Sequence, residues 1–231
     1  ISVYTGIMAL NMRSPDTAAH FNSAGSAGFY AAILSQKDQK LGQLSLELFR
    51  EGVKRFPENI ALRFNLARVL WVYGSYEEAY DVFCQLIDNH KLLKFNASVD
   101  GLLSHRIRPL SDMFNYGDYY RLAAETLQNP TSNYLVLNII ISSAYTYLAS
   151  AELIRNQPEQ ASGNLEKALT YDPYNFIAHR LSVETLSNIG GHEEPLLNSF
   201  FAAVNLYPPL LLSHGKKGIE AALILGKEKM A

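Results

Sequence analysis

Three segments of the chain repeat one arrangement of small and large side chains. In the clearest copy, Ala79 is followed four residues later by Phe83, and Leu86 follows after three more. Residues at this spacing lie on one face of an α-helix, the small one a turn before the large one. The same positions recur 34 residues upstream as Ser45, Phe49 and Gly52, and again later as Ala161, Leu165 and Ala168. The pattern predicts repeated amphipathic helices.

Two prolines follow the repeated helices at a constant distance. Pro57 comes twelve residues after Ser45, and Pro173 comes twelve residues after Ala161. Each opens a short run with helical apolar spacing, and proline is typical of a point where one helix ends and another begins. Small residues let two helices approach closely while the large residue fills the space beside them. The sequence therefore predicts stacked helical hairpins.

These residues give the chain a resemblance to the tetratricopeptide repeat (TPR) family, whose 34-residue unit carries W-x2-L-G-x2-Y in its first helix and A-x3-F…P in its second. The clearest copy is ALRFNLARVLWVYGSYEEAYDVFCQLI, although Arg63 replaces the first tryptophan and Lys91 the closing proline. Further copies are SAYTYLASAELIRNQPEQASGNLEKALTYDP and AGFYAAILSQKDQKLGQLSLELFREGVKRFP. The resemblance covers roughly two thirds of the chain. It implies an all-α fold, an α-solenoid of stacked helix-turn-helix repeats in a right-handed superhelix.

The repeat phase divides the chain into five expected segments. These are an N-terminal remnant or partial helix at 1–15, TPR-like repeats at 16–91, an atypical helical hairpin at 92–131, TPR-like repeats at 132–207 and a C-terminal capping helix at 208–231. The hairpin at 92–131 loses the repeat phase. It either keeps the stack continuous or marks a break into two subdomains.

The resemblance implies that a partner binds the concave face, which the first helices of the hairpins line. In the clearest copy, Phe64, Arg68 and Trp71 share one stripe of such a helix. Arg68 ranks first as a contact because an arginine is costly to bury without a partner. An alternative is that Phe64 and Trp71 belong to the core between hairpins. The other candidate partner-binding residues on first helices are Tyr30, Thr146, Arg180 and Glu184.

Composition and charge add little to this picture. The 231 residues carry a formal net charge of −2, which gives no electrostatic reason to expect nucleic acid as a partner. Cys84 is the only cysteine, which excludes an internal disulfide and weakly favours a reducing, cytoplasmic location. The segment 134–149 is apolar, but a membrane span needs about 20 predominantly apolar residues, so a buried helix is the better interpretation.

Catalytic patterns are missing from the sequence. The six histidines form no H-x-x-x-H pair, and no glycine-rich motif has the lysine and the preceding strand that a phosphate-binding loop needs. We therefore expect no catalytic residues, no metal and no cofactor.

Three functional hypotheses follow, and they differ in class. The first is a non-catalytic scaffold whose groove binds a protein or peptide segment. The second is a recognition or oligomerisation domain of a larger enzyme, such as a glycosyltransferase or methyltransferase, an idea encouraged by a chain that begins at Ile1. The third is self-association into a homo-oligomer through the ends of the superhelix.

Overall fold

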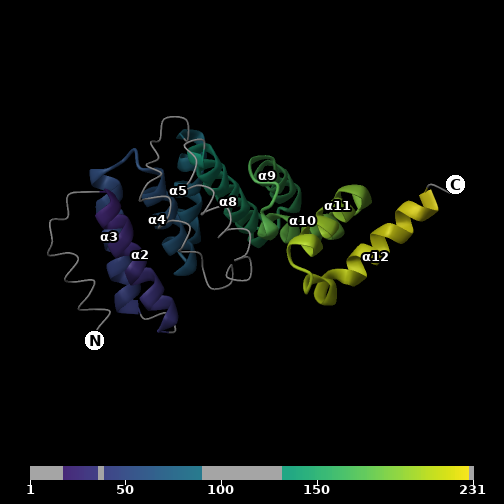
Figure 1. The fold of residues 1–231 in the computed structure, drawn as a ribbon, viewed down its shortest axis with the longest axis horizontal. Helices are drawn as coiled ribbons and strands as arrows, with labels where there is room; N and C mark the ends of the chain where they lie inside the picture. Colours follow the sequence, from purple (N-terminus) through teal and green to yellow (C-terminus); the bar gives the residue numbers. More distant parts are fainter. Residues whose placement is uncertain (1–17, 36–38, 90–131, 229–231) are drawn as a thin grey trace. The chain divides into compact units, whose positions relative to one another are not determined.

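A computed structural model describes residues 18–35, 39–89 and 132–228 of the chain. Within these residues every regular element is an α-helix (Figure 1). The chain divides into two compact units, residues 1–140 and 141–231. The segments expected at 1–15 and 92–131 lie outside the described residues.

The first unit contains two described helical hairpins. One is formed by α2 (Ala18–Leu34) and α3 (Gln39–Arg55), and the other by α4 (Ile60–Val72) and α5 (Tyr76–Asn89). Besides its own hairpin partner, α4 packs against both α3 and α2, so the two first helices, α2 and α4, are neighbours. The hairpin turn after α4 uses Gly74, whose φ of +83° lies in the left-handed region that favours glycine.

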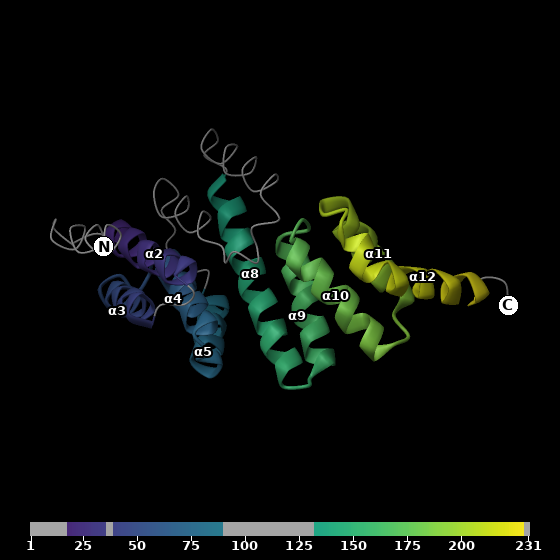
Figure 2. The same ribbon diagram turned by 90° about the horizontal axis from the view of Figure 1, so that it is seen from below.

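The second unit continues the same arrangement. It contains the later part of α8 (Ser132–Ile154), followed by α9 (Pro158–Tyr171), α10 (Phe176–Ile189), α11 (Glu193–Leu206) and α12 (Leu210–Glu228). Figure 2 shows α9 beside α10, and α11 between α10 and α12, in agreement with the packing of these helices. The prediction of an all-α fold built from helical hairpins is confirmed for the described residues.

The repeated small-large pattern forms the core. All nine of its positions are buried, and Ala79, Phe83 and Leu86 are fully so. In the first hairpin the Ser45 hydroxyl donates to the backbone carbonyl of Gly25 at 2.6 Å. A Cβ added at Gly25 would lie 2.9 Å from the Phe49 ring, so glycine is what lets α2 and α3 approach this closely.

The helix starts that follow the two prolines are capped in the same way. Asn59 lies two residues after Pro57, and its side-chain Oδ1 accepts a hydrogen bond from the backbone N–H of Leu62 at 3.0 Å. Asn175 lies two residues after Pro173 and accepts from the N–H of Ala178 at 3.1 Å. An asparagine at this position satisfies one of the free N–H groups of the first turn. Proline and asparagine together therefore determine where α4 and α10 begin.

One helix is long and apolar enough to cross a membrane. Within the described residues, the window Leu137–Ile154 of α8 meets that test of length and composition, and 56% of the window is buried inside the protein. The core helices of soluble proteins meet the same test.

Candidate binding face

A buried polar line connects the neighbouring first helices of unit 1. Asn65 of α4 donates its side-chain amide to Oδ1 of Asn22 on α2 at 2.7 Å. Asn65 Oδ1 in turn accepts from Nη1 of Arg68 at 3.2 Å. All three side chains are at least 98% buried. Because a buried polar group is costly unless it is hydrogen-bonded, the two bonds of this line favour the observed packing of α2 against α4.

Arg68 is buried at 2% exposure, against the expectation of an exposed contact. Two aromatic rings help to make this possible, since the guanidinium carbon lies 5.6 Å from the ring centre of Phe64 and 5.8 Å from that of Phe29. Aromatic faces stabilise a cation most where water is excluded. The Nη2 atom, however, is buried without a hydrogen-bond partner in the described structure. Arg68 is thus a buried cation with one donor unused.

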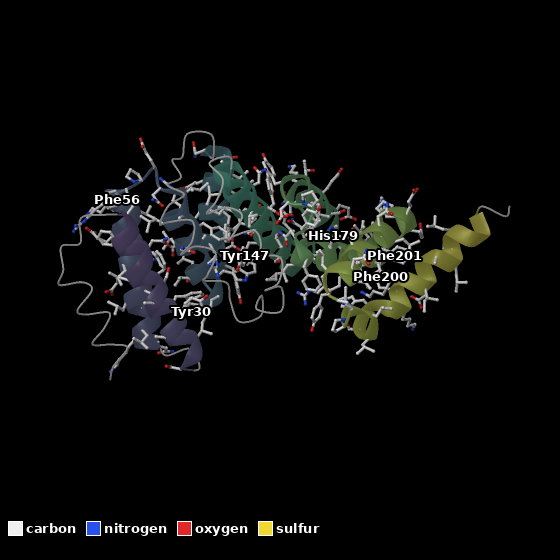
Figure 3. The ribbon with its side chains drawn as sticks, viewed as in Figure 1. Tyr30, Phe56, Tyr147, His179, Phe200 and Phe201 are labelled. Carbon is white, nitrogen blue, oxygen red and sulfur yellow. The ribbon has the colours of Figure 1, made fainter. Side chains whose placement is uncertain are left out.

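The other two members of the predicted stripe differ in burial. Phe64 is 6% exposed and meets Phe83 edge-on with ring centres 6.1 Å apart, as the core alternative predicted. Trp71 is half-buried, and its ring lies 4.9 Å from that of Tyr76 across the turn of the hairpin. Tyr30, on α2 (Figure 3), is also half-buried. The stripe is therefore partly core and partly accessible surface.

In unit 2, Thr146 takes part in an internal network. It is 6% exposed, its hydroxyl donates to the Ser142 carbonyl at 2.8 Å, and it accepts from the Asn175 amide at 3.1 Å. The same amide donates to the Ser142 hydroxyl at 2.8 Å. The asparagine that caps α10 therefore also fastens α10 to α8. As the structure places it, Thr146 stabilises the hairpin stack.

Arg180 and Glu184 lie one turn apart on α10 and are both half-buried. Arg180 resembles Arg68 in one respect, since its Nε is buried without a hydrogen-bond partner in the described structure. Glu184 contacts His214 of α12, with Oε1 and Nε2 3.0 Å apart. His214 Nδ1 also lies 2.7 Å from the Ser213 hydroxyl, which approaches the Leu210 carbonyl at 3.1 Å.

A line of polar side chains runs from Ser213 through His214 to Glu184, but its geometry does not suit a catalytic triad. The serine contacts the ring of the next residue in its own helix, and its hydroxyl donates to the Leu210 carbonyl, so its proton is directed at the backbone. The contact instead fastens α12 to α10. No group of three or more His, Cys, Asp or Glu side chains that could hold a metal occurs in the described parts of the chain.

Sequence reasoning missed His179 and Asn22, the α2 member of the polar line. His179 (Figure 3) is 9% exposed, and its Nε2 lies 2.8 Å from the Pro173 carbonyl. Burial lowers the pKa of its imidazole, although the Pro173 carbonyl and Asp172 act in the opposite direction. Asn22 is a polar residue in a largely apolar helix, and that contrast is a signal by which it could have been found.

Comparisons with known proteins do not assign a family. No family model matches the chain, and no significant match was found among curated proteins. Among solved structures, the chain is similar to a thermophilic TPR protein of Thermus thermophilus, at 12% sequence identity and a TM-score of 0.35, over 86% of this chain and 99% of that one. Because that score is low, the functional inference rests on this chain's own residues. The described residues form an all-α protein of stacked helical hairpins.

Proposed function

We propose that the chain is a non-catalytic scaffold that binds a segment of a partner protein along its first helices. The observation that carries this proposal is the unused Nη2 donor of Arg68. Nearly all buried polar groups in folded proteins are hydrogen-bonded, and leaving one unpaired costs about 1–3 kcal/mol, more when it is charged. Nη2 is buried in the chain without its partner, so the proposal includes a local movement of the side chains that cover it, which lets a carbonyl or carboxylate oxygen of the partner bond to it and remove that cost.

The surroundings of Arg68 support a protein ligand. Tyr30 and Trp71 are half-buried on the two neighbouring first helices. Tyrosine, tryptophan and arginine are the residues most enriched among those that dominate binding energies. In unit 2, Arg180 offers a second unused guanidine donor on a first helix, with Glu184 one turn later. A peptide segment presents the acceptor oxygens and apolar side chains that such a face would bind.

Other features favour protein over other ligand classes. The net charge of −2 gives no broad attraction to nucleic acid. The proposal includes a cytoplasmic location, which the single cysteine weakly favours.

The proposal is tested with two arginine variants of the same helix. Arg68→Met removes the unused donor and keeps a long apolar side chain. Arg63→Met is the matched control, because Arg63 lies five residues earlier on α4 and already donates its Nε to the Pro57 carbonyl at 2.7 Å. Partners captured from the native host are identified with the wild type, and their affinity for all three proteins is then measured by calorimetry.

Arg68→Met should weaken binding about 10-fold to 100-fold, the equivalent of one charge-assisted hydrogen bond, while Arg63→Met binds as the wild type does. Thermal melts of both variants are recorded alongside. A partner bound equally well by a folded Arg68→Met protein would contradict the proposed site.

A further inference from the structure

The last helix, α12, leaves an apolar face uncovered. Leu212, Ile219 and Leu223 are 92%, 63% and 60% exposed. Their separations of seven and four residues place them on one stripe of the helix. The opposite side of α12 is the one that packs, since Gly218 and Ala221 are buried there against α11. The stripe therefore faces away from the helices that hold α12 in place.

Two glycines complete the stripe without serving the packing of the chain itself. Gly215 and Gly226 lie three and fourteen residues after Leu212, on the same side of the helix. A Cβ added at Gly226 would meet no atom within 4 Å. A Cβ added at Gly215 would meet only the Leu211 side chain, at a van der Waals distance of 3.7 Å. At these two positions the space beside the backbone is open, and glycine leaves room there for the close approach of a further helix.

We propose that this stripe binds the same stripe of a second copy of the chain, with the two α12 helices antiparallel about a two-fold axis at Ile219. The stripe is symmetric about that residue. Leu212 lies seven residues before it and Gly226 seven after, while Gly215 lies four before and Leu223 four after. An antiparallel pair therefore places each leucine against a glycine of the other copy. Large side chains meet small ones on either side of the axis, and the two Ile219 side chains meet each other on it.

The charges beside the stripe complement one another in the same arrangement. Lys216 and Glu220 lie on one flank, with their side chains 87% and 58% exposed and their Nζ and Oε1 atoms 3.7 Å apart within the helix. Antiparallel helices related by a two-fold axis present the same flank to each other. Lys216 of one copy then lies within about 3 Å, along the axis, of Glu220 of the other. Two attractive pairs form across the axis.

The size of the contact predicts a weak, concentration-dependent dimer. From Leu212 to Gly226 the paired stretch is about 21 Å long at 1.5 Å per residue. One helix of that length buries less than the roughly 800 Å² per partner of a standard interface. We therefore expect monomer at low micromolar concentration and dimer at concentrations on the order of 100 μM and above.

Sedimentation equilibrium of the 231-residue chain tests the proposal. The mass should rise with concentration from 25.8 kDa towards twice that value. Ile219→Asp should stay monomeric at every concentration, because it places two carboxylates against each other on the axis. Ile154→Asp is the matched control and should dimerise normally, since Ile154 is 64% exposed but lies on α8. Circular dichroism confirms that both variants keep their helicity.

Disulfide cross-linking tests the antiparallel register in a Cys84→Ala background. Ile219→Cys should cross-link with itself under oxidation, because the axis brings the two residues together. Leu212→Cys should not, because its two copies would lie about 21 Å apart and a disulfide needs Cα atoms within about 7 Å.

Four results would overturn the inference. They are a monomer at every concentration, a dimer that survives Ile219→Asp, equal cross-linking at positions 212 and 219, and stripe-dependent binding to anionic lipid vesicles in place of dimerisation. None of these results depends on the partner-binding face of the first helices, so the two proposals succeed or fail separately.

Discussion

Replacing Arg68 with methionine should leave unit 1 about as stable as the wild type, although Arg68 is among the most buried side chains of the protein. The guanidinium gains a hydrogen bond to Asn65, worth about 1.5–3 kcal/mol, and two ring contacts worth about 0.5–2 kcal/mol each. Against this stands a desolvation cost of several kcal/mol for a buried ion with one donor unused. The two sides nearly cancel, so we expect a change within about 2 kcal/mol.

Truncation to alanine should behave differently. Arg68→Ala removes the apolar stem as well as the charge and leaves a cavity beside Phe29 and Phe64. Removing a buried side chain of this length costs about 2–5 kcal/mol. Arg68→Met should therefore be more stable than Arg68→Ala by about that amount, because methionine keeps three of the heavy atoms that fill the space.

Urea unfolding followed by tryptophan fluorescence is a suitable assay. Trp71, the only tryptophan, lies on the same helix as Arg68 and reports on unit 1 directly. A loss of more than about 4 kcal/mol in Arg68→Met would refute the reasoning, because it would mean that the charge itself stabilises the fold. Equal stabilities of the two variants would refute the packing part of the reasoning.

Two further predictions concern unit 2. A Cβ at Gly218 would lie 2.6 Å from a phenylalanine ring of α11, so Gly218→Ala should destabilise the protein by about 1–3 kcal/mol. A Cβ at Gly163 would meet no atom within 4 Å, so Gly163→Ala should stabilise the protein by about 0.5–1 kcal/mol. Melting temperatures that change in the same direction in both variants would contradict this packing. Burial lowers the pKa of His179, so the unfolded chain takes up a proton near pH 6.5 before the folded one does. The contribution of neutral His179 to the free energy of unfolding should be fully present above about pH 7. It should fall as the pH drops below 6.5 towards the lower pKa of the folded state. His179→Gln, which keeps an N–H donor, should reduce that fall; an unchanged pH profile would show that His179 is not its source.

The sequence alone was enough to predict the helices and the way they pair. The small-large spacing of Ala79, Phe83 and Leu86 recurs at three places and is buried at each of them. Pro57 and Pro173 mark where first helices begin, and the asparagines two residues later cap them. These features are set within one or two helical turns, where spacing along the chain determines which side chains share a face.

The surroundings of individual residues could not be read in that way. Arg68 was expected on an exposed stripe because a lone arginine is costly to bury. Its burial depends on Phe29 and Asn22 of another helix, which lie 39 and 46 residues away along the chain. Thr146 likewise bonds to an asparagine 29 residues away. Helical periodicity tells which side of a helix a residue occupies, but only the packing of neighbouring helices decides whether that side meets water, an aromatic ring or a hydrogen-bond partner. The free energy of a charged or polar side chain depends on those neighbours, and for this protein the tertiary structure alone supplies them.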